Sequence, residues 1–255
     1  MSNPLFRLEG KVVLITGSGG GLGFAIARGM GQAGATVVLN GRNTQKLDAA
    51  VNTLRDEGLK THGVAFDVTK KGEVEAGIAR IENEIGPLAV LFNNAGINLR
   101  APLPEVPEEI WHKVIDTNLT GALLTSQAAA KRMIPRKHGK IVNMCSMMSE
   151  LARATTASYA AAKGGLKMLT KAMALEFGPH NIQVNGIGPG YFLTEMTRPL
   201  LDVPGFNDWI CKRTPMNRWG NPDELIGAAI FLAAPASSFV TGQVIYVDGG
   251  ILATL

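Results

Sequence analysis

Short apolar runs alternate along the chain with longer stretches in which apolar residues recur every three or four positions. The run Val12–Ile15 is followed by such a stretch, whose apolar members are Leu22, Ile26, Ala27 and Met30. Runs of this length predict buried strands, and the longer recurrence predicts helices. Further strands are expected at 36–39, 63–68, 88–92, 140–145, 182–187 and 244–247, and further helices at 48–57, 73–85, 108–133 and 159–177.

The unbroken alternation of strands and helices predicts the fold class. Repeated strand–helix units with right-handed crossovers form a parallel, doubly wound sheet. We expect one Rossmann-type α/β domain over residues 1–255, with a seven-stranded parallel sheet flanked by helices. Its cofactor half covers about 8–120 and its catalytic and substrate half about 121–255. Ligands of such sheets bind beyond the carboxyl ends of the strands.

Composition and charge indicate a globular protein and argue against two classes of partner. Of the 255 residues, 46% are hydrophobic and 18% are charged, which suffices for a large core. The net charge of +4 is small and the basic residues are scattered, so no nucleic-acid surface is indicated. The apolar run 228–234 is too short for a membrane span, and residues 1–11 lack a signal-peptide core. We expect a cytoplasmic protein that does not bind membranes.

The cysteines and histidines do not have the spacing of a disulfide framework or a metal site. Cys145 and Cys211 are far apart, and the four histidines are scattered. Cys145 directly precedes Ser146 and is interpreted as a packing residue. We therefore expect no bound metal.

A glycine-rich segment follows the first predicted strand. Residues 16–23 read T-G-x-x-x-G-x-G, with Gly17, Gly21 and Gly23 as the fixed points, and a predicted helix begins at their end. Glycines let the backbone approach a pyrophosphate closely, and the helix N-terminus favours negative charge. The arrangement predicts a dinucleotide site.

The end of the second predicted strand indicates which dinucleotide binds. An NAD site usually has an acidic residue there for the ribose 2′-hydroxyl, but this strand ends in Asn40, Gly41 and Arg42. The planar guanidinium of Arg42 can pair with a 2′-phosphate, and Ser18 can add a hydroxyl contact. NADP is favoured over NAD. The alternative is that Arg42 is only a solvated loop residue.

Tyr159 and Lys163 are four residues apart and therefore lie on one helix face, with Ser146 thirteen residues upstream of the tyrosine. An ammonium beside a phenol favours the phenolate, so we expect Lys163 to lower the pKa of Tyr159. Such a tyrosine can exchange protons with an alcohol while the serine hydroxyl holds the developing oxyanion. The alternative is an ordinary surface pair on a helix.

Taken together, the motifs resemble the short-chain dehydrogenase/reductase family over residues 8–250. The resemblance rests on residues 16–23, Asp67-Val68, Asn93-Asn94-Ala95-Gly96, Asn118-Leu119-Thr120-Gly121, Ser146, Tyr159, Lys163, Pro189-Gly190 and Thr194. It implies a catalytic set of Asn118, Ser146, Tyr159 and Lys163, in which Tyr159 is the acid/base, Ser146 orients the carbonyl, Lys163 binds the nicotinamide ribose and Asn118 holds a relay water. It implies cofactor contacts from Gly17, Ser18, Gly21, Leu22, Gly23, Arg42, Asp67, Val68, Asn94, Ala95, Gly96, Tyr159, Lys163, Pro189, Gly190 and Thr194.

The substrate half resembles the gluconate 5-dehydrogenase (5-ketogluconate reductase) branch of that family, on the segments 143–153, 185–197, 209–215 and 218–220. This implies reduction of a sugar-acid ketone, with substrate contacts from Arg100, Ser146, Met148 and Tyr159. Met148 stands where the branch tends to carry glutamine, and the branch usually has Gln-Arg-Arg where this chain has Asn98-Leu99-Arg100. One alternative is a carbonyl or 3-oxoacyl-thioester reductase on a less polar substrate. Another is a non-catalytic dinucleotide-binding protein, which the complete catalytic set argues against.

Assembly as a homotetramer is implied mainly by the family resemblance. The helix 161–177 has apolar residues on more than one side, and the chain ends in the apolar segment 251–255. Both features suit burial against neighbouring subunits, although the tail could instead fold back on its own domain.

Overall fold

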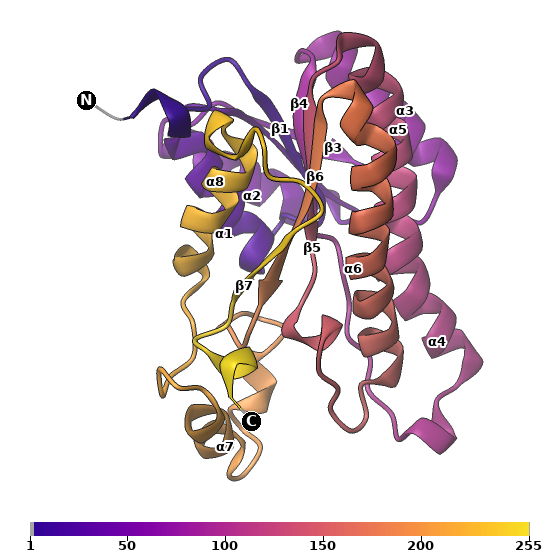
Figure 1. Ribbon diagram of the computed structural model, residues 1–255, viewed down its shortest axis with the longest axis vertical. Coiled ribbons are helices and arrows are strands. Elements are labelled where there is room, and N and C mark those ends of the chain that lie inside the picture. The colour runs from indigo at the N-terminus through magenta and orange to yellow at the C-terminus, as the bar shows by residue number, and fades with distance from the viewer. Residues whose placement is uncertain (1–2, 255) are drawn as a thin grey trace.

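Seven parallel strands run through the centre of the molecule, in the order β3-β2-β1-β4-β5-β6-β7 (Figure 1). The computed structural model describes residues 3–254. The sequence prediction of a seven-stranded parallel sheet is confirmed. The strands are β1 Val12–Ile15, β2 Thr36–Gly41, β3 Thr61–Ala65, β4 Leu88–Asn93, β5 Gly139–Met144, β6 Ile182–Pro189 and β7 Val244–Val247.

Helices cover both faces of this sheet, giving three layers in Figure 1. On one face lie α1 and α2 with α8, and on the other lie α3, α4, α5 and α6. The short helix α7 lies below the sheet in Figure 1, near the C-terminal segment. The helices are α1 Gly21–Gln32, α2 Thr44–Asp56, α3 Lys71–Glu84, α4 Glu108–Ile115, α5 Gly121–Arg136, α6 Ala157–Phe177, α7 Phe206–Arg213 and α8 Ile226–Ala233.

The strands are apolar on both sides because each face of the sheet is covered. In β1, Val13 and Ile15 belong to the apolar layer shared with α1, α2 and α8. Val12 and Leu14 belong to the layer shared with α3, α5 and α6. Side chains alternate across a strand, so a sheet buried on both faces needs continuous apolar runs. This explains why such runs predicted the strands well.

The third strand is an exception, because the prediction placed it at 63–68 and the structure places it at Thr61–Ala65. Within residues 3–254, β3 pairs with β2 alone, and the last pair of this ladder is Gly41 with Ala65. Beyond Ala65 the chain has no ladder to join, although Phe66 and Val68 remain buried and apolar. Asp67 and Val68 therefore lie on the loop that follows β3, beyond its carboxyl end.

The single long helix predicted for 108–133 contains a turn of π-helix. The segment Asp116–Thr120 joins α4 to α5 with wider hydrogen bonding. Such turns are uncommon and occur mostly at functional sites. This one places the buried Asn118 beside the loop that follows β4, where its amide bonds Ile97.

The C-terminal segment folds back on its own chain at Ile251, which is buried against Met147 and Met148. The last residue, Leu255, lies outside the described residues. Apolar surface also remains on α6, where Met168 is 62% exposed and Leu175 is 80% exposed. Assembly as a homotetramer stays a prediction.

Among residues 3–254, no helix combines the length and apolar character needed to cross a membrane.

Close packing between α3 and the segment after β3 gives a test of the fold. A β-carbon added at Gly77 would lie 2.4 Å from Cδ1 of Phe66, whereas one at Gly72 of the same helix meets no atom within 4 Å. We expect Gly77→Ala to lower the free energy of unfolding by about 1–3 kcal/mol through overpacking. Gly72→Ala should be neutral or raise it by up to about 1 kcal/mol. Urea unfolding of both variants measures this, and equal stability of the two would contradict the packing.

Candidate functional site

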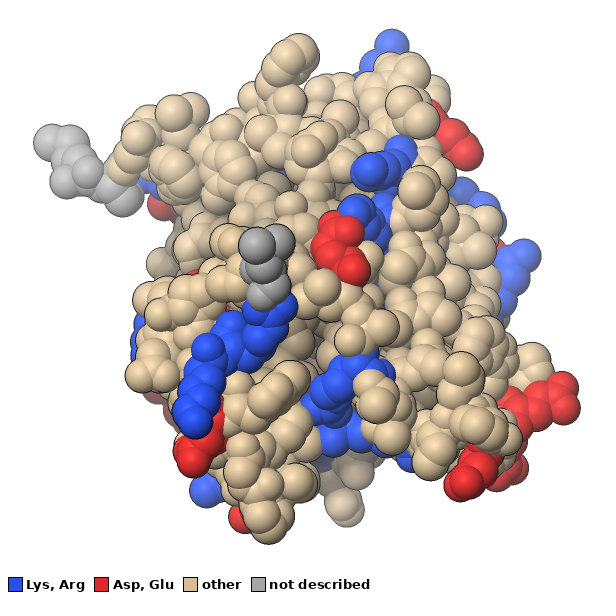
Figure 2. Space-filling view, turned by 60° about the horizontal axis from the view of Figure 1, so that its bottom comes forward, with Lys and Arg blue, Asp and Glu red and all other residues tan. Residues whose placement is uncertain are grey.

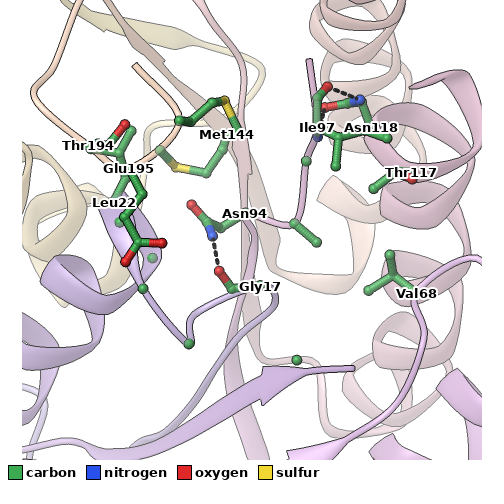
Figure 3. A pocket seen from close by; sticks show the side chains of 18 of the residues that line it. Gly17, Leu22, Val68, Asn94, Ile97, Thr117, Asn118, Met144, Thr194 and Glu195 are labelled. Carbon is green, nitrogen blue, oxygen red and sulfur yellow. Dashed lines mark hydrogen bonds between the residues drawn. The ribbon is translucent and has the colours of Figure 1, made fainter. Parts of the chain in front are cut away.

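A cavity of about 770 Å³ opens at the carboxyl ends of the central strands (Figure 3). Loops that follow β1 to β6 meet there, which includes the point between β1 and β4 where the strand order reverses. Open α/β sheets bind ligands at this place. Most of the predicted site residues line the cavity: Gly17, Gly21, Leu22, Gly23, Arg42, Asp67, Val68, Asn94, Ala95, Gly96, Asn118, Ser146, Tyr159, Lys163, Pro189, Gly190 and Thr194.

The glycine loop packs so closely against the loop after β4 that side chains are excluded. A β-carbon at Gly17 would lie 2.7 Å from Cα of Ala95, and one at Gly23 would lie 2.4 Å from Nδ2 of Asn94. Asn94 donates from Nδ2 to the carbonyl oxygens of Thr16 and Gly17, at 2.9 and 3.0 Å; Figure 3 shows the second bond. The result is a bare backbone cradle at the start of α1, which fits the pyrophosphate of a dinucleotide.

Ser18 does not take part in this cradle, contrary to the prediction of a hydroxyl contact to the cofactor. Its side chain is fully buried, and it is not among the residues that line the cavity. Its hydroxyl donates to the Ile15 carbonyl at 2.7 Å and accepts from the Asn40 N–H at 3.1 Å. These two bonds connect the loop after β1 to the end of β1 and to β2, so the hydroxyl points into the protein.

Arg42 and Asp67 line the part of the cavity that is formed by the loops after β2 and β3. The Arg42 guanidinium lies 3.4 Å from the Asp67 carboxylate, and its side chain is 63% exposed. Burial alone raises the pKa of Asp67, but hydrogen bonds from Thr69 and the charge of Arg42 bring it below its usual value. The ionised Asp67 therefore holds Arg42 at the cavity edge, where the guanidinium can reach a bound anion.

Asn118 is buried within the π-helical turn and bonds the loop that follows β4. Its Nδ2 donates to the carbonyl oxygens of Ile97 and Val114, at 2.9 and 2.8 Å, and its Oδ1 accepts from the Ile97 N–H at 3.3 Å. Figure 3 shows the Ile97 contact. The side chain thus fixes the cavity wall and retains one acceptor lone pair at Oδ1, which suits the predicted relay water.

Ser146 and Tyr159 come together at the end of the cavity nearest β5. Tyr159 belongs to α6 and lines the cavity together with Ser146, whose hydroxyl acts to lower the tyrosine pKa. The Ser146 hydroxyl oxygen also accepts from the Met148 N–H at 3.1 Å, which fixes its orientation. The loop after β5 and the start of α6 thus present two hydroxyl groups to one place in the cavity.

Lys163 lies one helical turn beyond Tyr159 and is almost fully buried. Its Nζ donates to the Met144 carbonyl at 2.6 Å and lies 5.5 Å from the centre of the Tyr159 ring. Burial raises the pKa of Tyr159 to about 12 and lowers the pKa of Lys163 to about 8. The expectation that Lys163 lowers the tyrosine pKa is wrong for this site: loss of solvent raises that pKa, the Ser146 hydroxyl only partly offsets it, and the Lys163 ammonium is bonded to the Met144 carbonyl instead.

The two remaining predicted substrate residues do not line this cavity. Met148 is buried in an apolar cluster with Met147 and Ile251, against which Tyr159 also packs. Arg100 lies exposed on the loop after β4, where the charge of Arg153 and the Tyr191 ring act on it. Met148 therefore belongs to the apolar cluster that packs against Tyr159, and Arg100 lies outside the lining of the cavity.

Comparison with known proteins places this geometry in a family. The family model described as Enoyl-(Acyl carrier protein) reductase matches residues 17–252. The chain is 51% identical to 5-keto-D-gluconate 5-reductase of Escherichia coli strain K12 over 250 residues, 98% of each chain. It is 52% identical to 2-dehydro-3-deoxy-D-gluconate 5-dehydrogenase of Formosa agariphila over 257 residues, 100% of this chain and 97% of that one. This chain belongs to the short-chain dehydrogenase/reductase family.

A solved relative shows how closely the fold of this short-chain dehydrogenase/reductase is shared. Gluconate 5-dehydrogenase from Burkholderia cenocepacia J2315, in complex with NADP and tartrate, superposes with a TM-score of 0.96 and 49% sequence identity, covering 99% of both chains. The sequence-based resemblance to the family and to its gluconate 5-dehydrogenase branch is confirmed.

Two charged residues of the cavity were missed by the sequence reasoning. Lys46 of α2 and Glu195 of the loop after β6 line the cavity and form an ion pair at 2.6 Å across the glycine loop. A β-carbon at Gly20 would lie 3.2 Å from the Lys46 ammonium. No local pattern in the sequence indicates this pair, because it joins segments 149 residues apart.

The described part of the chain has no cluster of three residues able to hold a metal ion. Both cysteines are free. Cys145 is buried and packs with Ala122 and Leu166, and burial raises the pKa of its thiol. These contacts fit its interpretation as a packing residue.

Proposed function

We propose that this short-chain dehydrogenase/reductase uses NADP(H) to interconvert gluconate and 5-ketogluconate, or a similar sugar acid and its ketone. The observation that carries the proposal is the single cavity that joins the glycine cradle and Arg42 at one end to Ser146 and Tyr159 at the other. Two curated relatives, each at least 51% identical over nearly the full chain, act by name on sugar acids. A solved relative binds NADP together with a dicarboxylate, tartrate.

The nicotinamide, when bound, supplies or accepts the hydride. Tyr159, protonated at neutral pH because its pKa is about 12, gives its proton to the substrate oxygen as the ketone is reduced. The Ser146 hydroxyl donates a hydrogen bond to the same oxygen, since its own oxygen is held by the Met148 N–H. Lys163 holds a proton near the phenol and would contact the cofactor ribose, and Asn118 would hold the relay water.

We further propose that NADP is preferred over NAD. Arg42 is exposed at the cavity edge and positioned by Asp67, whereas Lys46 in the same cavity is paired with Glu195. Guanidinium groups bind phosphate through paired hydrogen bonds, whereas a ribose hydroxyl gains little from a cation. Asp67, Val68, Asn94, Ala95, Gly96, Pro189, Gly190 and Thr194 would contact the rest of the cofactor.

A second candidate is a carbonyl or 3-oxoacyl-thioester reductase. It is favoured by the apolar cluster of Met147, Met148 and Ile251 behind Tyr159, which offers few polar groups to a polyol. Initial rates with 5-ketogluconate and with an apolar ketone, followed by NADPH absorbance, separate the two candidates. The sugar-acid proposal requires the higher kcat/KM for 5-ketogluconate.

We also propose a homotetramer in the cytoplasm. Exposed apolar side chains on α6, Met168 and Leu175, together with Trp111 on α4, give the outer face of this helical layer surface that a subunit interface would bury. The two free cysteines suit a reducing compartment.

Replacing Tyr159 with phenylalanine tests the catalytic assignment. The ring is kept and the transferable proton is removed, so kcat should fall roughly 10²–10⁴-fold while NADPH still binds. Tyr246→Phe is the matched control, because that hydroxyl bonds Glu150 and does not line the cavity. Steady-state rates with 5-ketogluconate provide the measurement. A Tyr159→Phe enzyme that keeps more than about a tenth of the rate has another proton donor.

Replacing Arg42 with aspartate tests the cofactor assignment. The new carboxylate repels a 2′-phosphate, so the KM for NADPH should rise about tenfold to a hundredfold while the KM for NADH stays level or falls. Arg80→Asp, which makes the same charge change on the exposed surface of α3, should leave both values unchanged. Equal use of NADPH and NADH by the unmutated enzyme would show that Arg42 does not recognise the phosphate.

A further inference from the structure

Two arginines from different loops are brought together beside the catalytic end of the cavity. Arg100 follows β4 and Arg153 follows β5, and the Ala101 N–H donates to the Thr155 carbonyl at 3.2 Å, which ties the two loops. The Thr156 hydroxyl donates to the Arg153 carbonyl at 2.8 Å and fixes the turn that carries Arg153. Burial and then the charge of Arg153 lower the pKa of Arg100, so the charge of Arg153 reaches the Arg100 guanidinium.

Arg153 is held in a defined orientation by two aromatic residues. Its Nη1 donates to the Tyr191 hydroxyl at 3.3 Å, and its guanidinium carbon lies 5.1 Å from the centre of the Phe206 ring. Tyr191 in turn packs against the same apolar cluster as Tyr159. The guanidinium is therefore joined to the catalytic end through one side chain, Tyr191.

No carboxylate of residues 3–254 forms an ion pair with Arg100 or Arg153. Figure 2 shows basic side chains gathered in a hollow below the centre of the face turned towards the viewer, with acidic side chains at its sides. Two neighbouring cations repel each other, and the repulsion is relieved when an anion binds between them. The pair is thus suited to an anionic ligand.

We propose that Arg153, positioned by Tyr191 and Phe206, forms with Arg100 a two-arginine clamp for the substrate carboxylate, and that Arg153 selects acids over neutral ketones. The inference rests on the proposed function and names the group that recognises the acid. A guanidinium fixed in one orientation can make two parallel hydrogen bonds to a carboxylate. The clamp holds one end of the substrate from the loops after β4 and β5, while Ser146 and Tyr159 act on the ketone.

Arg153→Met tests the clamp, since methionine keeps the apolar stem near Phe206 and removes the charge. The KM for 5-ketogluconate should rise about tenfold to a hundredfold, with kcat within a few-fold of the unmutated enzyme. The KM for the primary amide of 5-ketogluconate should not change. Arg153→Lys should recover part of the loss, and Arg132→Met on the exposed face of α5 should have no effect.

Equal rises in KM for the acid and its amide would show that Arg153 has a structural role only, and an unchanged KM for the acid would overturn the clamp. Tyr191→Phe provides a separate check of positioning. It removes the hydroxyl that holds Arg153 and should raise the KM for the acid by a smaller factor than Arg153→Met, again without changing the KM for the amide.

Binding of tartrate separates failure of the clamp from failure of the proposed function. Trp219 packs on Tyr191 with ring centres 5.5 Å apart, so its fluorescence should report an anion bound at Arg153. Tartrate should give a saturable change in the unmutated enzyme loaded with NADP, and a Kd at least about tenfold weaker in Arg153→Met. If 5-ketogluconate is not reduced but this difference is found, the clamp stands and the substrate is another acid. If the two proteins bind tartrate equally, or neither binds it, the clamp is wrong.

Discussion

Loss of solvent around the partly buried Tyr159 phenol and the buried Lys163 ammonium is the constraint on which the site depends. Lys163 has almost no contact with solvent, and its ammonium is held by the Met144 carbonyl at the end of β5. The same loss of solvent raises the pKa of Tyr159 to about 12 and lowers that of Lys163 to about 8. At neutral pH the phenol therefore keeps its proton, and the site is set to give a proton to a developing alkoxide.

The sheet makes this burial possible and also determines what surrounds it. Each strand is covered on both faces, so polar groups and loops gather at the carboxyl ends, where the cavity lies. Loops after β1 to β3 supply the glycine cradle and Arg42, while the loop after β5 and the start of α6 supply Ser146 and Tyr159. Arg100 and Arg153, which we propose to bind the substrate carboxylate, lie on the loops after β4 and β5, outside the lining of the cavity. The division between a cofactor half and a substrate half follows from the strand order and remains a prediction for the domain as a whole.

The sequence predicted the fold and most cavity residues, because apolar runs and short motifs act locally. Its errors have a common cause in contacts between distant segments. The end of β3 depends on where β2 stops pairing, at Gly41 and Ala65. The Ser18 hydroxyl is used by β1 and β2, and the pKa of Tyr159 depends on burial by loops far along the chain. The Lys46–Glu195 pair, 149 residues apart, has no local signal.

The pH dependence of the two reaction directions tests the central claim most directly, that Tyr159 is a protonated acid with a raised pKa. Initial rates are measured for 5-ketogluconate with NADPH and for gluconate with NADP from about pH 6 to about pH 10, which lies below the raised tyrosine pKa throughout. Below a pKa of about 12 the phenolate fraction grows about tenfold per pH unit, so alcohol oxidation should rise towards alkaline pH while ketone reduction stays high at neutral pH. Oxidation that is as fast at pH 6 as at pH 10 would contradict it.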